Sequence, residues 1–536
     1  VVTRLGDYPE PILGDTVTLN PNRTVLTDTD ASFPVPAGNA PGLTGLYVDI
    51  NDGTGFLELP RLIIDNTAIS LTVSPAFNVD LDETSTYRIS TVPESQTDGL
   101  HYPSQEHFSF LWSDPGTDSA DTIEAGSGTN IVFGSNGADV ITSGENSTNI
   151  IFGDDGYSYL SAGDGDGSLT ATTSHAVTAI TEKSGQGAAD TITLADGTSS
   201  VISGAAGDII QIGNGTNHVL ADEGLLQYSD SLLVSATSLN PSVGGSDTVT
   251  IAGGANLVIA GAGQDTIDIV AAQAADDRAV VLGDSGEAIF TDNVLEWATT
   301  LAPGIGDSDT ITVTTNNNTV IGGAADDMIT VGGGINRVIG DAGEVNLPTT
   351  GDQTVRSIDP TIGGADSITV QGGVNYVIGG FLGDTIQGIP AAGLTEPQIF
   401  GLGDNGIMTF NAAGFLTQIT STDMCVAGDD TFQLADSDDV IVAGMGIDTV
   451  NIDRTSGATL GSNAGNDILL GDNGEITFIA SASDSQPLSV LTTSPECSSP
   501  DQIFGGNDND VILGGGGNDT LNAGTDAGDD LVFSDH

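Results

Sequence analysis

Residues 505–519 read GGNDNDVILGGGGND, and this stretch decides the fold. It contains a glycine-rich turn, an aspartate and a short aliphatic run, and after nine residues the turn and aspartate return. Such turns need glycine, because glycine tolerates positive φ and lets two backbones approach closely. The aliphatic runs are rich in strand formers. The stretch therefore predicts short β-strands joined by tight turns, with an aspartate closing each turn.

The nine-residue spacing continues back to residue 121. Seven sets of acidic or amide residues keep it, and their first members are Asp121, Asp190, Asp247, Asp309, Asp366, Asp430 and Asp501. Two units make a coil of 18 residues, so aspartates 18 apart should lie on adjacent coils about 4.8 Å apart. Stacked coils would form two parallel sheets around a thin aliphatic core. Residues two places after an aspartate, such as Ile267, Ile311 and Ile368, should point into that core.

A longer period of about 63 residues lies on top of the coils. Each of the first six sets closes with a turn containing an aspartate and is followed by an insert that we interpret as a β-hairpin; residues 406–422, GIMTFNAAGFLTQITST, have two apolar runs around a turn. The predicted inserts lie near residues 155–187, 223–244, 285–306, 342–363, 405–427 and 473–499. Each cassette is thus expected to be two coils plus one protruding hairpin, whose free edge could pair with another chain.

The composition is strongly acidic. The 536 residues include 74 Asp and Glu against 9 Lys and Arg, a formal net charge of −65. This charge repels nucleic acid and anionic membranes, and no apolar run is long enough to span a bilayer. Carboxylates a few ångströms apart repel each other unless a cation lies between them, and Ca²⁺ accepts carboxylate and turn-carbonyl oxygens. A halophilic surface is the alternative explanation of the charge, but it does not account for the glycine or the register.

The repeat resembles the RTX, or haemolysin-type calcium-binding, repeat, whose unit is G-G-x-G-x-D-x-U-x. Close matches are Gly514–Asp519, Ala260–Asp265 and Gly505–Asp510. The resemblance covers residues 116–536. It implies an all-β protein with a calcium-binding parallel β-roll, or β-solenoid, of seven cassettes. It also implies an extracellular or cell-surface location, since such repeats occur in large secreted bacterial proteins.

The aspartates in this register are the expected calcium ligands. They are Asp121, Asp139, Asp190, Asp208, Asp247, Asp265, Asp309, Asp327, Asp366, Asp384, Asp430, Asp439, Asp448, Asp501, Asp510 and Asp519. Weaker candidates close the cassettes at Asp154, Asp284, Asp341, Asp404 and Asp472. Many alternate turns carry Asn instead, as in Ile311–Asn318, and Asn can form ladders through its side-chain amides. We therefore expect calcium mainly on the Asp side. The Asn side should bind calcium weakly or not at all, except where Asp439 and Asp510 restore a carboxylate.

Residues 1–115 differ from the repeats. Glycine falls, proline rises, and the sequence alternates between polar and apolar residues, as in residues 45–73. This pattern predicts a small β-sandwich-like or β-meander domain. It could cap the roll or serve assembly.

The two cysteines, Cys425 and Cys497, occupy matching places at the ends of consecutive inserts. Two or three coils should separate them, which is more than the ~4.4–6.8 Å between Cα atoms that a disulfide accepts. A leaning hairpin could close the gap. The sequence leaves both a Cys425–Cys497 bridge and free thiols open.

Three classes of function remain. The first is a calcium-stabilised extracellular structural protein that assembles into a filament, matrix or surface layer. The second is an adhesin or other binding module on an RTX stalk, with cell-surface or matrix polysaccharide or ice as its target. Threonine pairs such as Thr248 and Thr250 suggest ice binding. The equivalent pair on the next coil is Thr266 and Asp268, so the threonine array is interrupted. The third, more remote, is a fragment of a secreted enzyme. No nucleophile–base motif is present, so we expect no enzyme.

We expect copies of the chain to assemble head to tail. The last apolar run, Leu531–Phe533, is not followed by an insert, and a solenoid end needs a cover. The strand-like segment Val1–Leu5 of the next copy could supply it. The chain begins at Val1 without a signal-peptide pattern, so we expect a processed or excised segment. In a longer polypeptide the same junction would be covalent.

Overall fold

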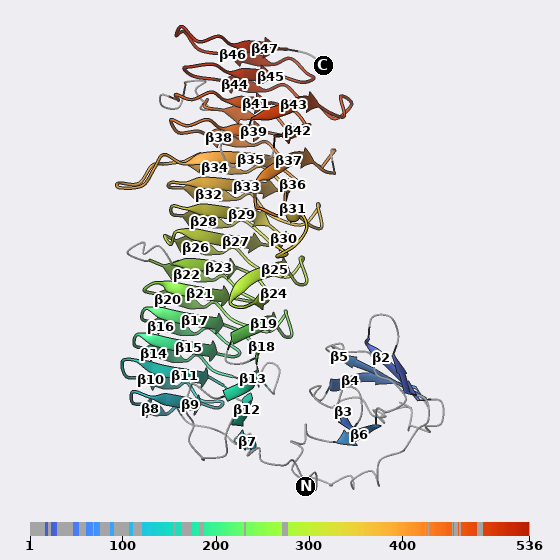
Figure 1. The fold of residues 1–536 in the computed structure, drawn as a ribbon, viewed down its shortest axis with the longest axis vertical. Coiled ribbons are helices and arrows are strands. Elements are labelled where there is room, and N and C mark those ends of the chain that lie inside the picture. The colour runs from blue at the N-terminus through green and yellow to red at the C-terminus, as the bar shows by residue number, and fades with distance from the viewer. Residues whose placement is uncertain are drawn as a thin grey trace. The chain divides into compact units, whose positions relative to one another are not determined.

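The computed structural model divides the chain into two compact units, Val1–Ser104 and Gln105–His536 (Figure 1). The structure describes residues 17–19, 23–28, 47–52, 61–67, 69–74, 86–90, 107–110, 120–154, 156–162, 174–181, 187–229, 232–270, 277–423, 425–426, 428–452, 454, 459, 463–479 and 486–534. The division falls earlier than the expected boundary at residue 115. The reason is that β7 (His107–Phe110) pairs with a strand of the second unit.

The first unit contains one six-stranded antiparallel sheet of order β1-β2-β5-β4-β3-β6. Its buried side chains alternate along the strands, as a half-buried strand requires, and include Leu26, Ile63 and Leu71. A small β-sandwich-like or β-meander domain was predicted, and the described strands are antiparallel and form a single sheet. The strands are β1 (Val17–Leu19), β2 (Val25–Asp28), β3 (Tyr47–Asp52), β4 (Arg61–Asn66), β5 (Ser70–Ser74) and β6 (Thr86–Ser90).

The second unit is a parallel β-roll, as predicted. It contains two sheets of 14 parallel strands each, and the strands of both sheets follow one another along the same axis (Figure 1). We call them the first and second parallel sheets. The first comprises β8 (Thr122–Glu124), β10 (Val140–Thr142), β14 (Thr191–Leu194), β16 (Ile209–Ile212), β20 (Thr248–Ile251), β22 (Thr266–Ile269), β26 (Thr310–Val313), β28 (Met328–Val331), β32 (Ser367–Val370), β34 (Thr385–Gly388), β38 (Thr431–Gln433), β40 (Thr449–Val450), β44 (Gln502–Phe504) and β46 (Thr520–Asn522).

The second parallel sheet supplies the other half of every coil. It comprises β9 (Thr129–Phe133), β11 (Ser147–Phe152), β15 (Gly197–Ile202), β17 (Gly215–Leu220), β21 (Gly254–Ile259), β23 (Arg278–Leu282), β27 (Asn317–Gly323), β29 (Ile335–Asp341), β33 (Val374–Gly380), β35 (Gln398–Asp404), β39 (Val440–Val442), β41 (Ile468–Leu470), β45 (Val511–Leu513) and β47 (Leu531–Phe533).

The register places equivalent residues of successive coils side by side. Ile311 pairs with Ile329, which in turn pairs with Ile368, although the first step is 18 residues long and the second crosses an insert. These side chains are fully buried in a continuous aliphatic core between the two sheets. The predicted inward positions are therefore confirmed.

The inserts fold as hairpins, but they do not protrude with free edges. Each hairpin pairs with the next, which produces a 13-stranded antiparallel sheet beside the second parallel sheet (Figure 1). We call it the hairpin layer. Besides β7 it comprises β12 (Gly156–Ala162), β13 (Ser174–Thr181), β18 (Gly224–Ser229), β19 (Leu232–Ser238), β24 (Gly286–Thr291), β25 (Val294–Thr300), β30 (Gly343–Asn346), β31 (Gln353–Ser357), β36 (Gly406–Phe410), β37 (Leu416–Ser421), β42 (Gly474–Phe478) and β43 (Pro487–Thr492).

The hairpin layer has its own core. Phe152, Phe400 and Phe410 are almost completely buried between this layer and the second parallel sheet. The expectation of free hairpin edges was wrong because the 63-residue period brings successive hairpins within pairing distance. Among the described strands, only the terminal ones, β7 and β43, are left as edges of this layer.

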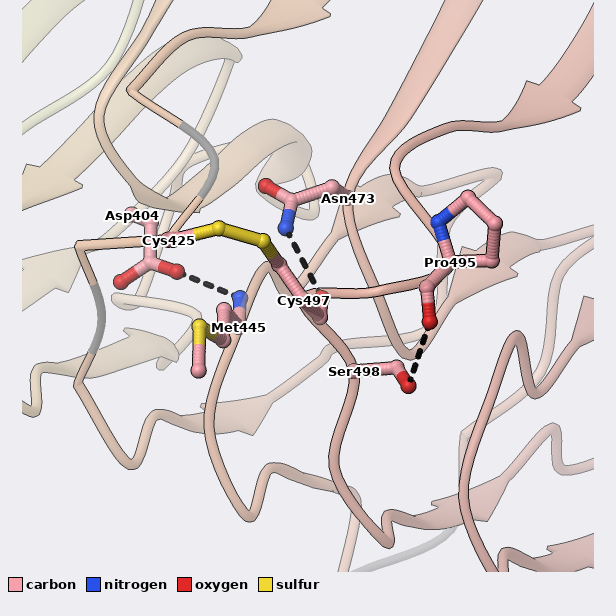
Figure 2. Close-up of a disulfide and its surroundings, with 7 residues drawn as sticks. All are labelled: Asp404, Cys425, Met445, Asn473, Pro495, Cys497 and Ser498. Atoms are coloured by element: carbon pink, nitrogen blue, oxygen red, sulfur yellow. Dashed lines mark hydrogen bonds between the residues drawn. A yellow bond between two sulfur atoms is a disulfide. The ribbon is translucent and has the colours of Figure 1, made fainter.

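Cys425 and Cys497 form a disulfide, with their Cα atoms 5.3 Å apart. Figure 2 shows the bridge joining the return segments of two consecutive inserts. The pairing of β37 with β42 brings these segments together. The separation of two or three coils that the sequence suggested therefore does not keep the two cysteines apart. Asn473 Nδ2 donates to the carbonyl oxygen of Cys497 (3.4 Å), which further fixes the second return segment.

We predict that the Cys425→Ser/Cys497→Ser double variant lowers the free energy of unfolding of the C-terminal cassettes by about 2–4 kcal/mol, because the bridge closes a long loop in the unfolded chain. Urea unfolding followed by circular dichroism measures the loss. Wild-type protein treated with reductant is the matched control and should behave like the variant. An unchanged unfolding midpoint in both would contradict the prediction.

Candidate calcium-binding sites

Fourteen aspartates form one continuous column along the edge of the roll. In each step, the backbone N–H of one aspartate donates to Oδ1 of the next, at 2.6 to 3.1 Å. We call this set the aspartate column: Asp121, Asp139, Asp190, Asp208, Asp247, Asp265, Asp309, Asp327, Asp366, Asp384, Asp430, Asp448, Asp501 and Asp519. All fourteen were predicted from the nine-residue register.

Along most of the column, the second carboxylate oxygen has no protein partner. From Asp190 to Asp501, every Oδ2 atom is buried and makes no hydrogen bond in the structure. These eleven residues are all at least nine-tenths buried. Buried carboxylate oxygens without a partner are costly, and such costs are normally met by a hydrogen bond or a cation.

Glycine keeps a space open beside these oxygens. A Cβ atom on Gly322 would lie 2.4 Å from Asp327 Oδ2 and 2.1 Å from the carbonyl oxygen of Gly340. A Cβ atom on Gly403 would lie 2.1 Å from Asp430 Oδ2 and 2.2 Å from the carbonyl oxygen of Ala443. Carboxylate and carbonyl oxygens therefore line one space that any larger residue would fill.

The electrostatics of the column favour neutralisation of its carboxylates, by protons or by a cation. Burial, aided by the neighbouring charges of Asp222 and Asp265, raises the pKa of Asp247 to about 11. Burial and the charge of Asp366 raise the pKa of Asp327 to about 11. Without metal the folded roll thus favours protonated carboxyls, because ionised ones lack both water and a positive partner.

These features fit Ca²⁺, which binds oxygen ligands and accepts carbonyls together with carboxylates. Within the part of the chain that the structure describes, no three His, Cys, Asp or Glu side chains converge on one point. Any metal on the column therefore needs turn carbonyls as additional ligands. That requirement suits Ca²⁺ better than Zn²⁺, which takes nitrogen and sulfur ligands.

The opposite edge of the roll carries asparagines, whose side chains bond to one another as predicted. Asn318 Nδ2 donates to Asn336 Oδ1 (2.8 Å), and Asn336 Nδ2 donates to Asn375 Oδ1 (2.7 Å). Asn217 and Asn256 form the same contact at 3.0 Å. An amide carries both a donor and an acceptor, so stacked asparagines can bond to one another without a cation. The match is incomplete at Asn217 Oδ1 and Asn256 Nδ2, which are buried without a partner.

Towards the C-terminal end this second edge changes to carboxylates. Asp439, Asp467 and Asp510 repeat the bonding of the aspartate column, each N–H donating to Oδ1 of the next acid, and Asp510 donates to Asp530. The Oδ2 atoms of Asp439 and Asp510 are buried without a partner. The carboxylates predicted at Asp439 and Asp510 thus lie in a second, shorter column, which we call the C-terminal column.

Sequence reasoning missed Asp467 and Asp530. They follow the previous acid of the column by 28 and 20 residues, because extra residues interrupt the nine-residue register. The local signal was present, since residues 463–467 read NAGND and residues 526–530 read DAGDD. A search for the turn motif without a fixed period would have found both.

The weaker candidates bind backbone instead. Asp404 accepts the N–H of Gly428 on Oδ1 (2.9 Å) and of Met445 on Oδ2 (2.5 Å; Figure 2 shows the latter). Asp154, Asp341 and Asp472 are bonded in the same two-sided way, and Asp284 accepts the N–H of Ala324. Asp222, which the ligand prediction omitted, belongs to the same group. We call these six the anchor aspartates, because they tie the return of each insert to the roll; a calcium role for the five predicted ones stays a prediction.

Comparison with known families bears on these columns. Residues 115–147, 303–343, 427–450 and 498–530 match the model of the RTX calcium-binding nonapeptide repeat, in four copies. A comparison with curated proteins found no match. The geometry defines a parallel β-roll with rows of buried carboxylates, and four of its segments match the calcium-binding repeat. Together these findings fit an RTX β-roll protein.

The matched repeats have known general properties. RTX nonapeptide repeats bind calcium ions at multiple sites, and they are typical of secreted bacterial proteins. Their β-rolls typically have structural or binding roles. The described residues contain no helical segment with the length and hydropathy that crossing a bilayer requires.

We predict that Gly322→Ala weakens calcium binding and lowers the free energy of unfolding by about 1–3 kcal/mol, because the new methyl group occupies the space beside Asp327 Oδ2. Gly126→Ala is the matched control, since a Cβ atom there has no neighbour within 4 Å. Calcium titration calorimetry and urea unfolding measure the two effects. Equal behaviour of the two variants would contradict the assignment.

We predict a pH dependence that calcium abolishes. The raised pKa values, about 7 for Asp265 and about 11 for Asp247, mean that the folded chain holds protons more tightly than the unfolded chain. In chelator, stability is therefore greatest below about pH 4 and falls as pH rises through the folded-state values. Melting temperatures at pH 4.5 and pH 8, with and without calcium, test this. A melting temperature that rises with pH in chelator would contradict it.

Proposed function

We propose that the chain is a calcium-stabilised structural protein that works outside the cell and assembles head to tail into a filament, matrix or surface layer. The observation that carries this proposal is the apolar end of the roll. Leu531, Val532 and Phe533 on β47 are 50%, 44% and 48% exposed. Ile512, which pairs with Val532 one coil earlier, is completely buried.

Covering this end would bury three large apolar side chains and pair the outer edge of β47. Each large apolar side chain that is fully buried contributes about 1.5–3 kcal/mol. The N-terminal region of the next copy, residues 1–115, is the partner that we propose. Its segment Val1–Leu5, the candidate strand for this edge, lies outside the described residues. A contact between unlike surfaces propagates as an open filament and does not close as a dimer.

Calcium should control this assembly, because the last coils carry both carboxylate columns. Asp510 and Asp519 lie in turns next to β47, one on each edge of the roll. Without calcium, the carboxylates at the end that makes the contact would repel one another. Extracellular calcium would therefore act as the condition for assembly.

Electron microscopy of the purified chain tests the proposal. With calcium we expect filaments, and with chelator dispersed particles. Phe533→Asp should shorten or abolish the filaments, whereas Leu488→Asp, at a 71% exposed position on β43, should leave them unchanged. Deleting residues 1–10 tests the partner side and should give folded monomers. Filaments of undiminished length from either end variant would refute head-to-tail assembly.

A further inference from the structure

The outer face of the first parallel sheet is set apart from the rest of the surface. On the ten strands β8 to β34, the first and third residues point away from the core, and the hairpin layer lies on the other side of the roll (Figure 1). Of these twenty outward residues, twelve are threonine and only Glu124 and Asp268 are charged. We call this surface the threonine face. In a chain with a net charge of −65, a surface of this size with two charges needs an explanation.

The face is exposed and regular. Thr248, Thr266 and Thr310 are neighbours in register on three successive strands, and all three are exposed. Val140, Ile209 and Met328 occupy the same row, 41%, 44% and 56% exposed. The exposed rows do not continue to β40, where Thr449 is completely buried.

We propose that the threonine face pairs with the same face of a second copy of this chain. Two chains that each carry −65 repel one another through most of their surfaces, and this face lets them approach without bringing rows of carboxylates together. The aspartate column does not oppose such contact, since it runs along the edge of the sheet where the turns lie. Sheets packed face to face lie about 10 Å apart, which is close to the ~8 Å screening length at physiological ionic strength.

The dimensions suit a dimer. Ten strands at about 4.8 Å give a length of roughly 48 Å, and four residues along each strand give a width of roughly 13 Å. The footprint is therefore roughly 600 Å² per copy, or roughly 1,200 Å² in total, at the lower end of specific interfaces. The three aliphatic side chains and the threonine methyl groups would be removed from water.

The composition favours a second copy over ice. Glu124 and Asp268 break the threonine rows, and Gln211 and Gln387 are longer than their neighbours, so a rigid lattice would not match the face. Flexible side chains such as Met328 adapt to an equally irregular protein surface. The contact is isologous, so it closes as a lateral pair and is independent of the head-to-tail contact at β47.

Sedimentation velocity of the full chain in calcium tests the proposal, in a Phe533→Asp background that removes the end contact. We expect the Phe533→Asp chain to form a dimer. Adding Thr248→Lys/Thr310→Lys should raise the dissociation constant of this dimer at least tenfold. Lysine reduces the net negative charge, so weaker association cannot come from general repulsion. The control is Ser229→Lys/Thr291→Lys, which places the same charges at exposed positions of the hairpin layer and should leave the dimer intact.

Met328→Glu, at the most exposed of the three apolar positions on the threonine face, provides a second test should the lysine variant fail to fold by circular dichroism. A monomer in calcium for the Phe533→Asp chain would overturn the proposal. A dimer that persists in the folded variants of the threonine face would also overturn it. The same holds if the monomeric chain shapes ice crystals or binds a neutral polysaccharide through this face. Loss of filaments with retention of the lateral dimer would separate the two contacts.

Discussion

Repulsion among stacked carboxylates is the constraint on which the rest of this structure depends. A parallel roll places equivalent residues of successive coils about 4.8 Å apart, so one aspartate per coil becomes a row of like charges. Each backbone N–H neutralises part of that charge through Oδ1, but Oδ2 of every member from Asp190 to Asp501 is left buried without a partner. We infer that calcium supplies the missing positive charge, in the space that glycine leaves beside these oxygens.

The two edges of the roll solve the same stacking problem differently. On the asparagine edge, amides such as Asn318 and Asn336 donate to the amide of the next coil and carry no charge to be neutralised. From Asp439 onward that edge becomes acidic, so the C-terminal cassettes carry carboxylates on both edges. The Cys425–Cys497 bridge lies in the same cassettes. The part of the roll with the greatest charge repulsion is thus also the part with a covalent tie, and it ends in the exposed strand β47.

Much of the fold could be predicted from the sequence, because each coil repeats a local signal. The nine-residue register was sufficient to place all members of the aspartate column, the inward aliphatic residues and the asparagine ladder. The hairpin layer could not be predicted, since pairing between inserts such as β37 and β42 depends on how far apart the cassettes stack. The disulfide depended on that same pairing, which is why the sequence left it open. Asp467 and Asp530 were missed because insertions shifted them out of register. The anchoring role of the six anchor aspartates could not be predicted, because their partners are backbone groups distant in sequence.

The central claim is that calcium on the carboxylate columns holds the roll together. Far-ultraviolet circular dichroism of the full chain at pH 7.5, after exhaustive chelation and again after calcium is restored, tests it most directly. We predict loss of strand signal across the repeats in chelator and its recovery with calcium, because metal-binding free energy is folding free energy here. An unchanged spectrum and melting temperature after chelation would contradict the account.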